Sequence, residues 1–403
     1  RILYTVINND LKYVRCMNMS ELRFMTAGES HGSCLTAILE GLPAGLKLDL
    51  DAINKDLARR QQGYGRGGRM KIEKDKVNVL SGVRFNETIG GPITLQVVNR
   101  DFQNWGERMA AFGEPAGEKV TAARPGHADF TGIRKYDRKD VRDILERSSA
   151  RETTMRVAVG AVCKEFLKAL GITVVSQVTC IGGVAIDPAR VDRAKLGTDI
   201  SDLNCYDAEA EAKMKAKIKE ARKAGDTLGG IFEITVRGLP AGLGSHIQWD
   251  RRLDGKLAGA LMSIQAIKGV EIGAGFDCAI LPGSQIHDEM FLDAAGKVYR
   301  KTNRAGGLEG GMTNGEELVV KAAMKPIPTL MQPLHSVDIE SHEEVLACKE
   351  RSDTCAVSAA SVVGEAMTAF VMAQAICDKF GSDAMVDLQA ALAAYKARIG
   401  KEW

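Results

Sequence analysis

Two stretches of the chain, far apart in the sequence, share one pattern of apolar and polar positions. Residues 37–60 read AILEGLPAGLKLDLDAINKDLARR, and residues 233–261 read EITVRGLPAGLGSHIQWDRRLDGKLAGAL. In each stretch a short apolar or alternating run is typical of a strand and Gly-Leu-Pro-Ala-Gly-Leu is typical of a turn. The segment that follows has leucine or isoleucine at helical spacing. We therefore predict a strand–turn–helix unit that is used twice, in two related halves packed on one core.

The other apolar patterns switch irregularly between strand spacing and helix spacing. Residues 76–85 and 91–100 alternate like two strands of an antiparallel hairpin around a Gly90-Gly91 turn. Helical spacing runs from residue 139 to residue 170 and ends at Gly171. Because strict alternation of strands and helices is absent, we predict an α+β fold with antiparallel sheets and a helical layer, and no doubly wound parallel sheet.

The most apolar segment, residues 355–377, has the length of a membrane span, but Glu365 and Gln374 interrupt it. We therefore expect a buried helix there and no membrane partner. Residues 1–20 combine a short apolar run with no small-residue cleavage site, which is not typical of a signal peptide. We interpret residues 1–20 as an N-terminal extension outside the fold, and residues 21–403 as a single domain.

The composition of the chain argues against a nucleic-acid partner and against a metal site. The 403 residues carry a net charge of +2 and only 5% are aromatic, so a general attraction to nucleic acid is not indicated. The nine cysteines include no C-x-x-C pair, which favours reduced thiols in a cytoplasmic protein. The six histidines form no H-x-x-x-H pair, so no metal site is expected.

Residues 59–70, RRQQGYGRGGRM, contain the G-x-G-x-x-G pattern that is typical of dinucleotide sites. Such a site needs a strand before the pattern and a helix after it. Here a helical segment precedes Gly63 and a charged, strand-like segment follows, so the dinucleotide interpretation fails. The loop presents Arg59, Arg60, Arg66 and Arg69. Either a bidentate anion site or a solvated basic loop fits these residues.

Several other loops carry polar residues that are typical of an anion site. AARPGHADF places His127 close to Arg124, and ERSSARETT places Arg151 beside two serines. TNRAGGLEGGMTNG is a second glycine-rich loop. The segment KPIPTL is held extended by its own two prolines. ERSDTCAV places Ser352 and Asp353 just before the buried helix, where either could cap it.

Each of these loops is also explained as a turn, a helix cap or a set of surface arginines. Together they predict one site that is built from loops, is rich in arginine, and has two acid/base candidates, His31 and His127.

Eight segments, in order along the chain, closely resemble the signature motifs of the chorismate synthase family. They span residues 22 to about 370 and read AGESHGSCLTAILEGLPAG, RRQQGYGRGGRM, ARPGHADFTGIRKY, ERSSARETTMRVAVGAV, GVEIGAGF, TNRAGGLEGGMTNGE, MKPIPTL and ERSDTCAV. The resemblance implies that 5-enolpyruvylshikimate 3-phosphate is converted to chorismate and phosphate, on the way to the aromatic amino acids. This reaction is a 1,4-anti elimination that needs reduced FMN and has no net redox change.

The resemblance also implies a fold and an assembly. The family fold is a β-α-β sandwich, with two antiparallel sheets around helices, and the usual assembly is a homotetramer. The short monofunctional form has no flavin reductase of its own. An external flavin reductase would therefore supply reduced FMN, and NADPH would act only indirectly.

By the same resemblance, the catalytic residues are His31, Ser30, His127 and Asp353. His31 would protonate the departing phosphate, with Ser30 beside it, and His127 would keep the reduced flavin in its productive protonation state. Asp353 would help to deprotonate flavin N5, which then accepts the proton from C6 of the substrate. The substrate carries two carboxylates and a phosphate, and its expected partners are Arg60, Arg66, Arg69, Arg124, Arg151 and Arg351.

The resemblance transfers the flavin contacts to residues of five segments. These contacts are Ser149, Ala150, Arg151, Gln265, Ala266, Gly310, Lys325, Pro326, Ile327, Pro328, Thr329, Arg351 and Ser352. Many relatives have a shorter residue in place of Gln265, so the resemblance implies a contact of the backbone there and leaves a contact of the side chain open.

Two other functions stay open at this point. A flavin oxidoreductase would use the same cofactor and consume reducing equivalents. A basic-loop module would bind RNA or polyphosphate through residues 59–70. The near-neutral charge and the low aromatic content count against the module.

Overall fold

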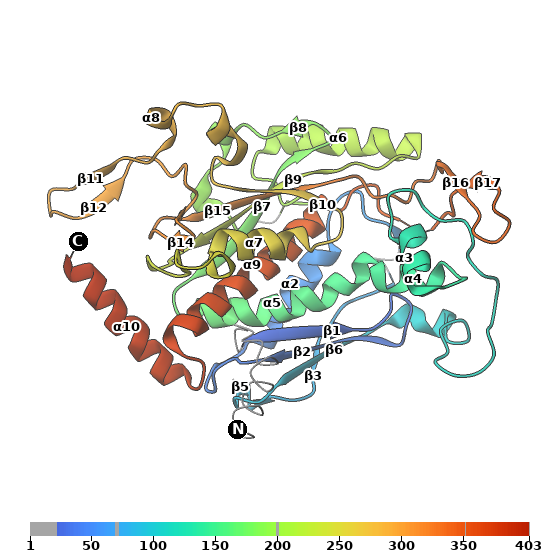
Figure 1. Cartoon of the computed structure of the whole chain (residues 1–403), viewed down its shortest axis with the longest axis horizontal. Helices are drawn as coiled ribbons and strands as arrows, with labels where there is room; N and C mark the ends of the chain where they lie inside the picture. Colours follow the sequence, from blue (N-terminus) through green and yellow to red (C-terminus); the bar gives the residue numbers. More distant parts are fainter. Residues whose placement is uncertain (1–21, 69–71, 199–200, 351, 403) are drawn as a thin grey trace, which may run out of the picture.

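Two antiparallel sheets lie on opposite sides of a layer of helices in the computed structural model of the chain (Figure 1). The structure describes residues 22–68, 72–198, 201–350 and 352–402, so the predicted extension at 1–20 lies outside the described residues. The first sheet has the strand order β1 (Arg23–Ala27), β2 (Cys34–Glu40), β6 (Ile93–Val98), β3 (Asn78–Val79). The second has the order β10 (Ile267–Ile272), β15 (Leu318–Met324), β9 (Gly230–Arg237), β7 (Thr173–Ile181), β8 (Val184–Ala185).

Shorter strands form antiparallel pairs outside these sheets. The pairs are β4 (Val83–Arg84) with β5 (Glu87–Thr88), β11 (Met290–Leu292) with β12 (Val298–Arg300), β13 (Leu308–Glu309) with β14 (Met312–Thr313), and β16 (His335–Val337) with β17 (Glu344–Leu346). The α-helices are α2 (Leu50–Gln61), α3 (Asp129–Tyr136), α4 (Arg142–Ser148), α5 (Thr153–Lys168), α6 (Ala208–Ala224), α7 (Leu253–Met262), α8 (Gly283–Ile286), α9 (Val357–Phe380) and α10 (Met385–Glu402). These elements confirm the prediction of mixed helices and antiparallel sheets.

Helices α5 and α9 pack against each other between the two sheets (Figure 1). One side of the pair contacts β2 and β6 through α5, and the other side contacts β7 and β9 through α9. Helix α9 is long and apolar enough to cross a membrane, but nearly all of its residues are buried inside the protein. The prediction of a buried helix in this segment is therefore confirmed.

Each Gly-Leu-Pro-Ala-Gly-Leu segment forms a turn that a threonine side chain closes. In the first turn, Thr88 Oγ1 donates to Pro43 O at 2.7 Å and accepts from Leu46 N at 2.9 Å. In the second turn, Thr313 Oγ1 makes the same two bonds with the matching proline oxygen, at 2.7 Å, and leucine nitrogen, at 2.8 Å. The first turn leads from β2 into α2, and the second leads from β9 into α7. A strand, a turn and a helix thus follow one another at both places.

The helical spacing at residues 139–170 predicted helical structure, and this prediction is confirmed, but the segment is divided between two α-helices. Two helices, α4 and α5, are separated at Ser149, whose backbone is extended and whose side chain accepts a hydrogen bond from Arg151 N at 3.3 Å. A serine that caps the next turn competes with continuation of the helix, and apolar spacing does not register this competition. The break turns residues 149–151 toward the cavity described below.

The antiparallel hairpin predicted around Gly90-Gly91 is present in a modified form. Strand β3 pairs with β6 as expected, but the chain between them makes a further hairpin from β4 and β5. Its two turn residues, Phe85 and Asn86, have φ values of 50° and 64°. Positive φ at both positions is the geometry of a tight two-residue turn, which asparagine favours and phenylalanine does not. The phenylalanine hid this turn from the sequence pattern.

The close packing of α5 on α9 predicts a strong effect of a side chain at Gly160. A Cβ atom placed on Gly160 would lie 2.3 Å from the Cα of Ala366, and both atoms belong to helices in the core. We expect Gly160→Val to lower the free energy of unfolding by about 3 kcal/mol, since the helices must separate. Urea unfolding measures the loss. The control is Gly259→Ala in α7, where a new Cβ meets no atom within 4 Å and stability is expected to stay or rise.

Candidate active site

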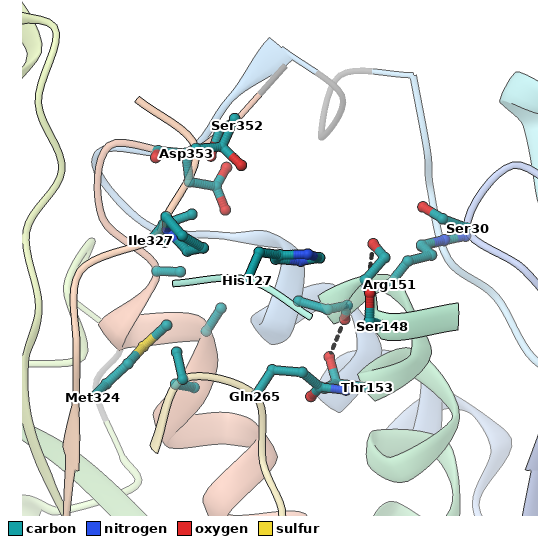
Figure 2. Close-up of a pocket in the computed structure, with 18 of the residues that line it drawn as sticks. Ser30, His127, Ser148, Arg151, Thr153, Gln265, Met324, Ile327, Ser352 and Asp353 are labelled. Carbon is teal, nitrogen blue, oxygen red and sulfur yellow. Dashed lines mark hydrogen bonds between the residues drawn. The ribbon is translucent and has the colours of Figure 1, made fainter. Parts of the chain in front are cut away.

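A cavity of about 680 Å³ lies beside the first turns of α5 and α9. Figure 2 shows His127 between Ser352 and Asp353 on one side and Ser30 and Arg151 on the other. Most of the site residues expected from the sequence line this cavity. They are Ser30, His31, Arg60, Arg66, Arg124, His127, Ser149, Ala150, Arg151, Gln265, Ala266, Lys325, Ile327, Pro328, Thr329, Ser352 and Asp353.

A few expected site residues are not in this lining. Gly310 lies in the turn between β13 and β14, and Pro326 lies between lining residues without being one of them. Arg69 and Arg351 lie outside the described residues. In the part of the chain that the structure describes, no group of three or more histidine, cysteine or acidic side chains is arranged to hold a metal ion.

Two of the predicted arginines share one buried carboxylate. Arg60 Nη2 donates to Asp75 Oδ2 at 2.8 Å, and Arg151 Nη1 donates to both oxygens of Asp75 at 2.7 and 2.8 Å. Burial lowers the pKa of Arg60 to about 10. Burial also raises the pKa of Asp75, but Arg60 and Arg151 outweigh it and hold that pKa below its usual range. A second buried carboxylate, Glu73, lies 3.6 Å from Arg151 Nη2 through Oε2, so two carboxylates hold these two arginines.

Arg59, the neighbour of Arg60, does not line the cavity. Adjacent positions on a helix point about 100° apart, so the two arginines of α2 leave the helix on different sides. The Arg59 guanidinium binds Glu365 of α9, with Nη1 at 2.8 Å from Oε2 and Nη2 at 2.7 Å from Oε1. The interpretation of residues 59–70 as a loop with four arginines for one anion is therefore wrong for Arg59.

Asp353 ties the loop at residues 62–68 to the segment before α9. Arg66 Nη1 lies 3.0 Å from Asp353 Oδ2, and Gly67 N donates to Asp353 Oδ1 at 2.6 Å. Helix α9 is preceded by Ala356 and has no side-chain cap. The prediction that Ser352 or Asp353 caps this helix was therefore wrong, because both oxygens of Asp353 are engaged by the other loop.

A buried carboxylate in α3 holds His127. His127 Nδ1 lies 2.5 Å from Asp129 Oδ1, and Arg124 donates to the same carboxylate from Nε at 2.8 Å and from Nη2 at 3.1 Å. Burial raises the pKa of Asp129, but the hydrogen bonds from His127 and Arg124 outweigh burial and hold the pKa well below its usual range. Arg124 Nη2 also lies 3.1 Å from His127 Nδ1, but the ionised carboxylate at 2.5 Å only accepts hydrogen bonds, so we assign a proton to Nδ1 and leave Nε2 as the nitrogen that a ligand can use.

His31 has a similar partner in α4. Its Nδ1 lies 2.8 Å from Glu146 Oε1, and its backbone N–H donates to Glu146 Oε2 at 2.7 Å. The ring of Trp105 lies against the imidazole, with the ring centroids 4.1 Å apart. The cavity therefore contains two histidines that are each held by a buried carboxylate.

Two neighbouring residues that are expected to contact a flavin are unusual, Ala266 in its backbone conformation and Gln265 in its side-chain hydrogen bonding. Ala266 has a φ of 66°, a conformation that residues other than glycine rarely adopt. Its carbonyl oxygen accepts from Lys325 N at 2.9 Å, and Lys325 Nζ donates to Gly126 O at 2.6 Å. Gln265 Nε2 lies 3.3 Å from Glu152 Oε2, whereas Gln265 Oε1 is buried without a hydrogen-bond partner among the described residues. This oxygen is an acceptor that a ligand can satisfy.

Sequence reasoning missed the residues that hold these arginines and histidines in place. Asp75, Asp129 and Glu146 are all buried, and Trp105 lines the cavity. Asp129 follows His127 by two positions, and this local spacing was a usable signal. Asp75, Glu146 and Trp105 carried no such signal, because the arginine or histidine of the site that each one contacts is distant in the sequence.

Known proteins identify the family of this chain. The model of the family described as chorismate synthase matches residues 22–377. The chorismate synthase of Geobacter sulfurreducens is 58% identical over 379 residues, which cover 91% of this chain and 96% of that protein. The chain belongs to the chorismate synthase family. The chorismate synthase of Syntrophotalea carbinolica is 57% identical over 382 residues, which cover 94% of this chain and 98% of that protein.

A solved structure agrees with this assignment. The structure described as a crystal structure of chorismate synthase is 43% identical to this chain and has a TM-score of 0.74. The match covers 93% of this chain and 97% of that chain. Chorismate synthases are carbon–oxygen lyases of the shikimate pathway, and the family uses reduced flavin. The prediction of a shikimate-pathway lyase is thus confirmed and is favoured over the oxidoreductase and the basic-loop module.

Proposed function

We propose that this cavity binds 5-enolpyruvylshikimate 3-phosphate beside reduced FMN and releases phosphate by 1,4-anti elimination with no net redox change. The observation that carries the proposal is an arginine-rich wall together with two carboxylate-held histidines in one cavity. Guanidinium groups match carboxylates and phosphates with paired hydrogen bonds. The arginines assigned to the substrate are Arg60, Arg66, Arg124 and Arg151, with Arg69 and Arg351 outside the described residues.

Buried carboxylates orient these arginines before the substrate arrives. Asp75 binds Arg60 and Arg151, and Asp129 binds Arg124. An anion site whose donors are already oriented needs little reorganisation when charge develops on the departing phosphate. Arg60 Nε is buried and has no hydrogen-bond partner among the described residues, so it is a donor that an anion can satisfy.

The residues of the cavity fit a flavin. A volume of about 680 Å³ is in the range of pockets that enclose such a ligand. Ile327 and Pro328 offer apolar contact, Lys325 offers a cation for the phosphate group, and Gln265 Oε1 offers a buried acceptor. Reduced FMN, when bound, supplies electron density to the breaking allylic C–O bond. The residues proposed to hold it are Ser149, Ala150, Arg151, Gln265, Ala266, Lys325, Ile327, Pro328, Thr329 and Ser352, with Arg351 outside the described residues.

Proton transfer is assigned to residues on different sides of the cavity. An anti elimination removes its two groups from opposite faces of the substrate ring, so the acid and the base must stand apart. Asp353 and Ser30, the neighbour of His31, lie on different sides of the lining in Figure 2. We assign His31 as the acid that protonates the phosphate and Asp353 as the carboxylate that finally holds the proton lost from C6. His127, with its proton fixed on Nδ1, presents Nε2 to the bound ligands.

We also propose the assembly and the source of reducing power. The protein is expected to be a cytoplasmic homotetramer that obtains reduced FMN from a separate flavin reductase, with NADPH consumed only there. The support is the resemblance to the short monofunctional members of the family.

We further propose that residues 21–403 form one domain of two related halves in a β-α-β sandwich. In the first half β2 pairs with β6, and in the second β9 pairs with β15. Thr88 closes the first Gly-Leu-Pro-Ala-Gly-Leu turn and is the last residue of the β4–β5 hairpin. Thr313 closes the second turn and is the last residue of the β13–β14 hairpin. Each of these hairpins has a two-residue turn. Each half then continues into one of the two central helices, α5 or α9. This order of matching elements supports an internal duplication.

The redox state of the flavin tests the proposed chemistry. Phosphate release from 5-enolpyruvylshikimate 3-phosphate is measured without oxygen, once with reduced FMN and once with oxidised FMN. Release is expected only with reduced FMN, because the oxidised ring cannot donate electron density to the breaking bond. Equal release with both forms, or none with either, contradicts the proposal.

A further inference from the structure

Two residues of α4 build the surroundings of His31, because Glu146 binds His31 and Arg142 binds Glu146. Three nitrogen atoms lie within hydrogen-bond distance of the Glu146 carboxylate. His31 Nδ1 is 2.8 Å and Arg142 Nη1 is 2.9 Å from Oε1, and the backbone nitrogen of His31 is 2.7 Å from Oε2. The Glu146 side chain is only 3% exposed, so these three contacts take the place of water.

We propose that Glu146 is a positioning residue that keeps one ring proton of His31 on Nδ1, so that in the doubly protonated imidazolium the proton on Nε2 is the one that passes to the departing phosphate. This inference rests on the proposed role of His31 as the acid. Arginine and a backbone amide can only donate, so both oxygens of Glu146 must accept. The same carboxylate can then bind Nδ1 only as a donor. Burial raises the pKa of Glu146, but the hydrogen bond and charge of His31 outweigh it and lower that pKa, in agreement with an ionised carboxylate.

The orientation of the ring is fixed by a second contact. The His31 ring lies against Trp105, with 4.1 Å between centroids and 31° between planes. The Arg142 guanidinium lies 4.7 Å from the centroid of the same tryptophan ring and donates from Nη2 to Glu350 Oε1 at 3.1 Å. Arg142 therefore holds both the carboxylate at the edge of the imidazole and the aromatic ring at its face. Glu146 at the ring edge and Trp105 at the ring face together restrict rotation of the His31 side chain. A ring with a fixed orientation transfers its proton from one particular nitrogen atom.

The substitution Glu146→Gln tests the proposal with little change in volume. It replaces one acceptor oxygen by an NH₂ donor, so in either orientation of the amide at least one of the three donors faces another donor. We expect kcat for phosphate release to fall about 30-fold, with KM within about twofold of the wild-type value. The matched control is Glu40→Gln, which removes an exposed carboxylate that binds Arg23 Nε at 2.8 Å. This control is expected to keep the wild-type kcat.

A double variant separates positioning from a structural role. If Glu146 acts through His31, Glu146→Gln adds less than about twofold to the loss that His31→Ala alone causes. A further loss of about 30-fold in the His31→Ala background overturns the proposal, and so does a wild-type kcat in Glu146→Gln alone.

A parallel variant keeps the test decisive if Glu146→Gln does not fold. Arg142→Met removes one of the donors that orient Glu146 and is expected to lower kcat about tenfold only when His31 is present. An equal loss without His31, or no loss with it, overturns the proposal. A wild-type kcat in His31→Ala alone is a different failure, because it removes His31 as the acid and with it this part of the proposed function.

Discussion

Phosphate release should fall about a thousandfold when His31 is replaced by alanine, while 5-enolpyruvylshikimate 3-phosphate still binds. General acid catalysis contributes roughly 10²- to 10⁴-fold, and alanine cannot supply the proton. The arginines that hold the substrate are oriented by Asp75 and Asp129, which His31 does not contact, so substrate affinity should change little. Anaerobic initial rates and equilibrium binding of the substrate measure the two quantities separately.

The control for this variant is another histidine outside the cavity. His335 is exposed on β16 and does not line the cavity, so His335→Ala should keep the wild-type rate. Turnover at the wild-type rate in His31→Ala would remove His31 from the mechanism. Loss of substrate binding together with turnover would instead assign His31 to the binding of the substrate.

The second large effect concerns stability and a buried charge cluster, which consists of Glu365, Arg59, Lys164 and Asp56. Glu365 is 1% exposed in the middle of the apolar helix α9. Its oxygens accept from both nitrogens of the Arg59 fork, at 2.7 and 2.8 Å, and from Lys164 Nζ at 2.8 Å. Replacement of Glu365 by glutamine leaves two cations in the core with only Asp56 to balance them. We expect a loss of about 3–5 kcal/mol in the free energy of unfolding, measured with urea.

The pH dependence of this loss follows from the pKa of Glu365. Burial raises that pKa, but Lys164 and Arg59 outweigh burial and hold it well below its usual range. A lowered carboxyl pKa contributes stability that is present above the unfolded value, about 4.3, and is lost as the pH falls below it. The difference between wild type and Glu365→Gln should therefore shrink from about pH 5 downward. Glu40→Gln, the exposed control, should change stability by less than about 1 kcal/mol. A Glu365→Gln protein as stable as wild type at pH 7 would contradict this picture.

The apolar pattern predicted those elements whose side chains repeat on one face. The leucines of α2 and α7 and the long run in α9 specify their helices locally, and the repeated turn motif marked both places where a strand leads into a helix. The break at Ser149 and the turn at Phe85–Asn86 were not predicted. One depends on a capping hydrogen bond, and the other places phenylalanine at a positive φ that its residue type disfavours.

The sequence predicted which arginines and histidines belong to the site, but not how they are arranged in space. Arg60 and Arg151 are far apart in the sequence, and only the folded chain brings both to Asp75. Arg59 carried the same signal as Arg60, yet it points to α9, because helical rotation and not residue type decides the direction of a side chain. The acidic partners were missed for the same reason. A buried carboxylate is recognised by what surrounds it, and sequence spacing does not contain that information.

The central claim is that the flavin must be reduced although the reaction does not consume it. The most direct measurement is the amount of chorismate formed from excess 5-enolpyruvylshikimate 3-phosphate by the purified protein, without oxygen and with a fixed, limiting amount of reduced FMN. Chorismate in many-fold molar excess over FMN, with the flavin still reduced at the end, is the predicted result. One chorismate per FMN, with the flavin oxidised in step, would contradict it.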